Sequence, residues 1–236
     1  MLCGLAPSFL PAIAQRATSR QVQHCGRATQ TVDPDRGGRR PDRAGRRRCE
    51  LRLFLLGPAH EPARAVVRVA VAGHIQAYLK KNLETAVDMF DRALQVNENS
   101  AFAWGVSGST YCFLGRPDEA MERLRNAWRL SPFDPLNFWF CTVAGLAEFV
   151  AGRYDQAIGW LRKAQRMNAR FVACHRTLTA SLALSGDIEA ARVAAKDLLA
   201  VVPAYRVSVV AATYPLRRPG DLERLVEGLR LAGVPE

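Results

Sequence analysis

An alanine that follows an acidic turn recurs along this chain of 236 residues at an almost constant interval. The four alanines are Ala86, Ala120, Ala157 and Ala191, separated by 34, 37 and 34 residues. They lie in segments of similar pattern: NLETAVDMFDRAL, RPDEAMERLRNAW, RYDQAIGWLRKAQ and DIEAARVAAKDLL. A fixed period of this length is typical of repeat proteins, in which each unit buries its apolar face only against its neighbours. The period therefore predicts a stack of similar units.

Turn residues divide each unit into two helices. In the second copy we expect helices over about 101–114 and 118–130, joined by the turn GRPD. Gly115 favours a helix end, and Pro117 with Asp118 favours the start of the next helix. Pro132 ends the unit because proline cannot continue a helix. We predict an all-α chain with repeats at about 62–98, 101–134, 138–171 and 172–205, with three extra residues near SPFDPLN.

Small and large side chains alternate in a way that serves helix packing. We expect Gly108 and Ala120 where the two helices of the second repeat cross, because a larger side chain would separate the backbones. Trp104 and Tyr111 are seven residues apart and so share one helix face. Ala127 has the same small-residue role at the next junction. This pattern specifies shape and no reaction.

The pattern resembles the tetratricopeptide repeat (TPR) family. The second copy matches it at Trp104, Gly108, Tyr111, Gly115, Ala120, Ala127 and Pro132. The third matches at Gly145, Gly152, Tyr154, Ala157 and Ala164, with Cys141 and Glu148 at the Trp and Tyr positions; the fourth matches at Leu178, Gly186, Ala191 and Pro203. The first is weaker, at Gly73, Ala86, Phe90 and Ala93. The resemblance implies an α-solenoid of about four helix-turn-helix repeats over 61–205.

We call residues 206–236 the C-terminal segment. It begins like another helix over 205–213, is broken by YPLRRPGD, and continues as an amphipathic helix over about 219–232. Because a solenoid needs a terminal unit that hides its last core face, we predict a capping helix there. A partner-binding helix is the alternative.

The resemblance also implies where a partner binds, since the first helices of TPR units line an inner groove. The groove positions that it indicates are Phe102, Ser109, Phe113, Trp139, Thr142, Phe149 and Arg176. Such a groove is largely apolar and suits an apolar helix or extended peptide oriented by Arg176. It lacks the Lys/Asn/Arg clamp of TPR proteins that hold a peptide carboxylate. The alternative is that the aromatic residues pack against each other or against the C-terminal segment.

A narrower resemblance concerns the stretch NSAFAWGVSGSTYCFLGRPDEAMERLRNAWRLSPFDPLNFWF and the ending PGDLERLVEGLRLAGVPE. Both are similar to the C-terminal TPR region of bacterial class III adenylate/guanylate cyclases. This implies that residues 61–236 are a detached or truncated regulatory tail that affects cyclase activity or dimerisation, without the catalytic domain.

The first 60 residues have a different composition. They hold eleven arginines, no lysine and four acidic residues, whereas residues 61–236 hold 22 basic and 18 acidic residues. Arginine with Gly and Pro and little apolar content predicts disorder. A solvated tail and an artefact of a wrong start or reading frame are the two main interpretations. A nucleic-acid-binding arm is disfavoured, because aromatic residues are not interleaved with the charges.

The sequence gives no pattern for catalysis, a cofactor or a metal. His74 and His175 are expected as packed core residues, and the six cysteines, which form no C-x-x-C pair, as reduced thiols in the cytoplasm. No apolar run reaches the roughly 20 residues of a membrane span. We therefore expect a non-catalytic interaction scaffold in the cytoplasm whose partner is a protein or peptide.

Overall fold

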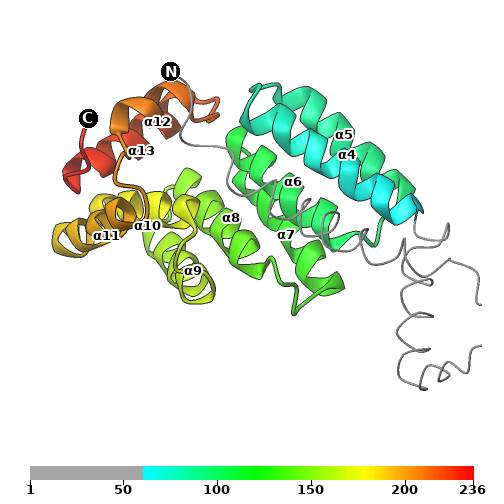
Figure 1. Cartoon of the computed structure of the whole chain (residues 1–236), viewed down its shortest axis with the longest axis horizontal. Helices are drawn as coiled ribbons and strands as arrows, with labels where there is room; N and C mark the ends of the chain where they lie inside the picture. Colours follow the sequence, from blue (N-terminus) through cyan, green and yellow to red (C-terminus); the bar gives the residue numbers. More distant parts are fainter. Residues whose placement is uncertain (1–60) are drawn as a thin grey trace, which may run out of the picture. The chain divides into compact units, whose positions relative to one another are not determined.

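The structure is a computed structural model that describes residues 61–236. This part of the chain forms ten α-helices and no strand, which confirms the all-α prediction (Figure 1). The predicted disordered segment 1–60 lies outside the described residues. The helices are α4 (Glu61–Tyr78), α5 (Leu83–Val96), α6 (Ala101–Phe113), α7 (Pro117–Leu130), α8 (Asn137–Val150), α9 (Tyr154–Met167), α10 (Val172–Leu184), α11 (Ile188–Val201), α12 (Val207–Thr213) and α13 (Pro219–Leu231).

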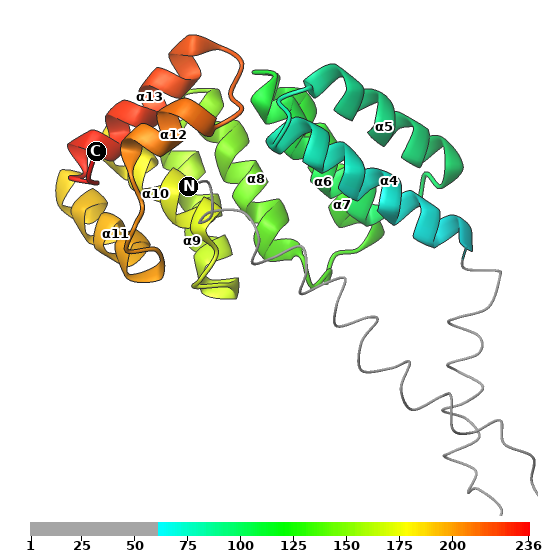
Figure 2. The ribbon, with the colours of Figure 1, turned by 45° about the horizontal axis from the view of Figure 1, so that its top comes forward.

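The first eight of these helices form four antiparallel pairs that stack in chain order (Figures 1 and 2). Helices α4, α6, α8 and α10 are the first members of the pairs, and we call them the A helices. Their partners α5, α7, α9 and α11 are the B helices. Each A helix packs against its own B helix and against the next A helix, so this part of the chain is a solenoid of helix-turn-helix units.

Glycine lets the helices of a pair approach closely at the crossing point. A Cβ atom on Gly108 would lie 3.4 Å from the carbonyl oxygen of Ala120 and 3.3 Å from Val143 of the next A helix. The corresponding Gly145 is tighter, because a Cβ atom there would lie 2.4 Å from Cγ of Leu161. A methyl group at Gly108 would therefore fit only tightly, and one at Gly145 would require Leu161 to move.

The turn between the two helices of a pair reverses the chain with a left-handed residue. Gly115 and Gly152 have φ values of 75° and 77°. In the turn after α6, the amide of Gly115 donates to Cys112 O and the amide of Arg116 to Tyr111 O, so the last carbonyls of the helix are satisfied. Lys81, with φ 55°, is the left-handed residue after α4. This conformation is unfavourable for a residue with a Cβ atom, and it matches the weaker repeat pattern of the first unit.

Consecutive pairs are also joined by a polar network on their outer side. Arg123 on α7 donates to Asp91 on α5 (2.9 Å) and to the hydroxyl of Tyr111 on α6 (2.5 Å). Its guanidinium lies 5.1 Å from the ring centre of Trp104. Trp104 donates from Nε1 to the carbonyl of Glu98. One arginine thus connects three helices of the first two pairs.

The C-terminal segment holds the last two helices, α12 and α13, and α13 is the expected terminal helix. It packs mainly against α10, an A helix, and only slightly against α11. The amide of Val207 donates to the carbonyl of Pro235, which closes α12 against the end of the chain. The last helix therefore covers the inner face of the fourth pair. Within residues 61–236 no helix is both long and apolar enough to span a membrane.

Candidate functional site: the inner face of the A helices

The A helices α6, α8 and α10 are buried on nearly all sides, whereas α4 at the start of the stack is partly exposed and the B helices bury one stripe. All eleven residues from Phe140 to Val150 of α8 and all ten from Cys174 to Ala183 of α10 are buried. By contrast, α7 buries three residues, spaced as expected for one face of a surface helix: Ala120, Leu124 and Ala127. A helix at the wall of an open groove would expose one face. Other residues of this chain therefore cover the inner face of these A helices.

The A helices lie on the inner side of the curve that the stack describes. His74 of α4 and Trp139 of α8 meet edge to face with ring centres 5.1 Å apart, although α6 lies between these helices in the stack. Side chains of the first and third A helices can meet in this way only if the stack curves with its A helices on the inner side. The inner face is thus partly filled by its own side chains.

The C-terminal segment covers much of the remaining inner face. Its first half reaches back to the first two pairs. The amide of Arg217 donates to the carbonyl of Phe113 at the end of α6 (2.9 Å). The guanidinium of Arg217 forms an ion pair with Glu84 at the start of α5, and the ammonium of Lys81 donates to the carbonyl of Ala212 (3.0 Å). The Arg217 guanidinium donates to the Glu84 carboxyl and lowers its pKa to about 2.

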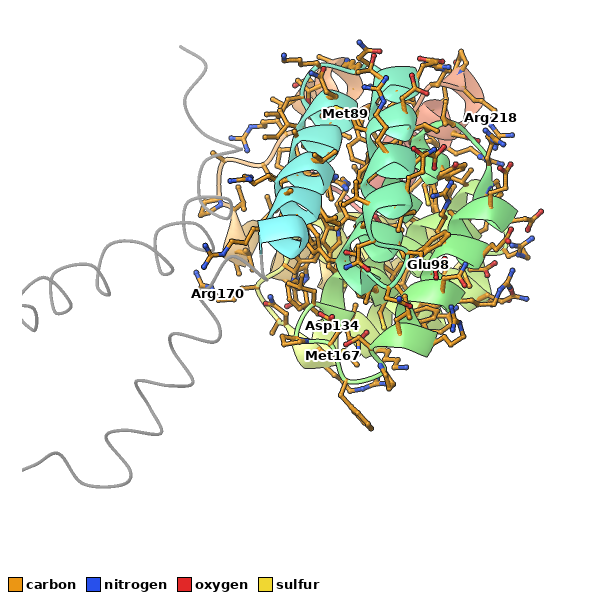
Figure 3. All side chains as sticks on the ribbon, turned by 90° about the vertical axis from the view of Figure 1, so that its right-hand side faces the viewer. Met89, Glu98, Asp134, Met167, Arg170 and Arg218 are labelled. Atoms are coloured by element: carbon orange, nitrogen blue, oxygen red, sulfur yellow. The ribbon has the colours of Figure 1, made fainter. Side chains whose placement is uncertain are left out.

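Two further arginines seat the start of α13 on the turns of the second and third pairs. Arg218 lies on the Gly115 turn so closely that a Cβ atom on Gly115 would be 2.2 Å from its Nε. Arg224 donates to the carbonyl of Val150 at the end of α8 (3.0 Å). Both also donate to the buried carboxylate of Asp221, at 2.7 and 2.6 Å. Figure 3 shows Arg218 at the edge of the stack opposite Asp134 and Met167.

The second half of α13 crosses α10 at very short range. A Cβ atom on Gly228 would lie 2.8 Å from both Cα and the carbonyl oxygen of Ala180. Leu225 and Leu229 are fully buried beside this crossing. Burying a leucine side chain stabilises by about 1.5–3 kcal/mol, so these two residues alone hold α13 firmly to the inner face.

An aromatic cluster surrounds Arg176 under the C-terminal segment. The guanidinium of Arg176 lies 3.9 Å from the ring centre of Tyr214, which follows α12. Tyr214 also contacts Phe113 (5.7 Å between ring centres) and Tyr78 (6.1 Å). Tyr205 is buried next to the same guanidinium. We call Tyr78, Tyr205 and Tyr214 the tyrosine cluster; it joins the first, second and fourth pairs.

Arg176 is a buried cation without an acidic partner among residues 61–236. Its side chain is 6% exposed and its Nε atom has no hydrogen-bond partner. Burial lowers the pKa of Arg176, but the neighbouring tyrosines raise this pKa by more than burial lowers it, so the guanidinium stays charged. Burial raises the pKa of Tyr214, against the opposing effect of Arg176, so the phenol is neutral near pH 7. The site therefore places one positive charge in an apolar, aromatic environment.

His74 is the second polar group in this region. Its Nδ1 atom is buried without a hydrogen-bond partner, and its ring stacks on Tyr78 with ring centres 5.9 Å apart. Desolvation lowers the pKa of His74 to about 4. The imidazole is therefore neutral at physiological pH, and Arg176 supplies the positive charge of this part of the inner face.

The predicted groove residues occupy different environments. Phe113 and Arg176 lie together against Tyr214. Trp139 contacts His74, and Phe149 is fully buried against Tyr154. Ser109 and Thr142 are buried and donate to carbonyls of their own helices, those of Val106 and Phe138. Phe102 is half-buried. The structure thus brings two of the seven into contact with the C-terminal segment.

The predicted repeat-signature residues serve the helix junctions. The alanines of the repeat signature are all buried: Ala120, Ala127, Ala157, Ala164 and Ala191. Gly186 has φ 96° in the turn after α10, and Pro132 and Pro203 are exposed in the connections between pairs. The other members, Trp104, Gly108, Tyr111, Gly145 and Tyr154, make the contacts given above.

The described thiols and His175 lie in the interior. Cys112, Cys141 and Cys174 are free and buried, and burial raises the pKa of Cys174 to about 12, which leaves the thiol protonated. His175 is buried and its Nε2 lies 2.8 Å from the carbonyl oxygen of Ala169. Within residues 61–236 there is no group of three His, Cys, Asp or Glu side chains that could hold a metal ion.

Comparison with solved structures agrees with this architecture. TTC0263, a thermophilic TPR protein of Thermus thermophilus, superposes with a TM-score of 0.53 at 22% identity, over 71% of this chain and 92% of its own. The chain has the TPR fold. The type IV pilus biogenesis factor PilW gives 0.54 at 19% identity, over 80% of each chain. An O-GlcNAc transferase variant of Thermobaculum terrenum gives 0.52 at 16% identity, over 73% of this chain and 41% of its own. No family model and no curated protein matches the sequence.

Sequence reasoning missed the tyrosine cluster. Tyr78, Tyr205 and Tyr214 lie outside the repeat signature, in a helix end and in connections. Only the break at YPLRRPGD, which ends α12 and lets the chain turn back, signals this arrangement in the sequence.

Proposed function

We propose that this chain is a non-catalytic scaffold whose inner face binds an amphipathic helix. One observation carries the proposal: the inner face already holds such a helix, α13, together with the preceding part of the C-terminal segment. The contacts are distributed over all four pairs, through Glu84, Phe113, Val150 and Ala180. The fold shared with TTC0263 supports an interaction role.

The same contacts describe the ligand that the inner face accepts. Leu225, Leu229 and Gly228 lie on the covered face of α13, and Arg218 and Arg224 lie on the edge that contacts the turns. Apolar residues three or four positions apart are the usual anchors of a helix bound in a groove. A partner helix would occupy this face in place of α13. We further propose a cytoplasmic location, which the three free buried thiols support.

A peptide-binding experiment tests the proposal. In the full chain, Leu225→Asp together with Leu229→Asp should prevent α13 from docking, and it changes no residue of the A helices; we call this variant the released chain. A fluorescein-labelled peptide of residues 206–236 should bind the released chain and fail to bind the wild-type chain, as measured by fluorescence anisotropy.

The matched control is the same peptide with Gly228→Val, whose added side chain would collide with the backbone of Ala180. Binding of the control peptide as tight as that of the unchanged peptide, or no binding of the unchanged peptide, would contradict the proposal.

The alternative function, regulation of a class III nucleotide cyclase, is supported by the sequence resemblance alone. Cyclic nucleotide formation by such a cyclase should change when the full chain is added if that alternative is correct, and should not change for a free-standing scaffold.

A further inference from the structure

We propose that the natural partner of the inner face is a peptide segment with an amphipathic helix and, in addition, an acidic residue opposite Arg176, for which the C-terminal segment is an imperfect substitute. The inference rests on the proposed function of the inner face and concerns the chemistry of its ligand. It starts from the absence of an acidic partner for this buried guanidinium within residues 61–236.

A buried cation without a carboxylate is a costly feature of a folded protein. Arginine cannot lose its proton at physiological pH, so the charge remains in a site that excludes water. The C-terminal segment offers it the ring face of Tyr214, which attracts a cation more weakly than a carboxylate held in good geometry does. The remaining neighbours are the hydroxyls of Tyr78 and Tyr205. The segment thus covers Arg176 without neutralising it.

The site is suited to a carboxylate. The carboxylate of a glutamate extends about as far from Cβ as the centre of a tyrosine ring does, so a glutamate in place of Tyr214 would meet the guanidinium directly. The hydroxyls of Tyr78 and Tyr205 could then donate to its oxygen atoms, which satisfies the condition for a favourable buried ion pair. Among the described side chains of α4, α6, α8 and α10, the one acidic residue is Glu148, and its carboxylate is already paired with Arg153.

The C-terminal segment is otherwise a good ligand, so the acidic residue decides the competition. A partner with similar apolar anchors has no advantage over α13, which is always present at high local concentration. A carboxylate that pairs with Arg176 gives the partner an interaction that the segment lacks. Specificity for an acidic helix then follows from this single contact.

Peptide variants test the inference with the released chain. Peptides of residues 206–236 carrying Tyr214→Glu and Tyr214→Gln have nearly the same size and differ in charge. We expect the glutamate peptide to bind about tenfold or more tightly than the glutamine peptide. In a released chain that also carries Arg176→Met, the order should be lost or reversed.

The outcomes separate the two proposals. The proposed acidic partner is wrong if the glutamate and glutamine peptides bind equally, or if the unchanged peptide binds more tightly than both. In either case the inner face remains a helix-binding site, and a second copy of this chain is the better candidate ligand. If no peptide binds, both proposals are wrong.

A second measurement needs no released chain. In the otherwise wild-type chain, Tyr214→Glu should give a higher melting temperature than Tyr214→Gln, and Arg176→Met should abolish that difference. Equal melting temperatures of the two variants would overturn the inference.

Discussion

The contact between Gly228 and Ala180 allows a matched pair of substitutions in one helix. In α13, Gly228 lies against the backbone of Ala180, whereas Gly220 has open space around its Cβ position. Replacing either glycine by alanine makes the same chemical change. Because alanine favours a helix over glycine by up to about 1 kcal/mol, Gly220→Ala should leave stability unchanged or raise it slightly.

Gly228→Ala should have the opposite effect. The new Cβ atom would be 2.8 Å from Cα of Ala180, and a backbone atom cannot turn away as a flexible side chain can. Overpacking of this kind costs about 1–3 kcal/mol, which exceeds the gain in helix propensity. For a chain of this size each kcal/mol corresponds to about 2–4 °C in melting temperature. Thermal unfolding followed by circular dichroism should therefore rank Gly220→Ala above wild type or equal to it, and Gly228→Ala below both. Equal melting temperatures of the two variants would refute the packing of α13 on α10.

Three further predictions concern the repeats and the inner face. Ala120→Trp should destabilise the chain by about 1–3 kcal/mol or more in urea unfolding, because Ala120 is fully buried where α6 and α7 cross, whereas Glu122→Gln on the exposed side should change little. Gly145→Ala should destabilise the wild-type chain but cost clearly less in a Leu161→Ala background, since Leu161 is the side chain that the new Cβ atom meets; an unchanged cost would contradict that contact. His74 has a folded pKa of about 4 against 6.5 when unfolded, so the unfolded chain binds more protons between these values, and stability should fall by up to about 3 kcal/mol as the pH drops from 6.5 to 4. His74→Gln should flatten this part of the stability–pH curve, and a curve equal to that of wild type would show that His74 is not the group responsible.

The sequence predicts the helix pairs well because their determinants are local. Gly115 and Pro117 mark a turn that needs a left-handed residue and a helix start, and both effects act within a few residues. The spacing of Ala120, Leu124 and Ala127 marks the buried stripe of a B helix in the same way. Such signals need no knowledge of distant parts of the chain.

The candidate site was much less predictable because it depends on long-range contacts. Arg176 is identified as an inner-face residue from its position in the repeat, but its neighbours come from α4 and from residues at or beyond the end of the last repeat. The amphipathic pattern of α13 shows that one face is buried without showing against which helix. A capping helix at the end of the stack and a helix on the inner face have the same sequence pattern.

The central structural feature is the C-terminal segment, which lies across the inner face as far as the first pair. Nitroxide labels are attached to Lys80→Cys and Ala211→Cys, two exposed positions, in a chain whose accessible native cysteines have been replaced. The distance between the two labels, measured by electron spin resonance, tests this placement directly. These residues adjoin Lys81 and Ala212, which are joined by a hydrogen bond of 3.0 Å. The account predicts a single short distance near the lower limit of the method. A long or broad distribution in the folded wild-type chain would contradict it.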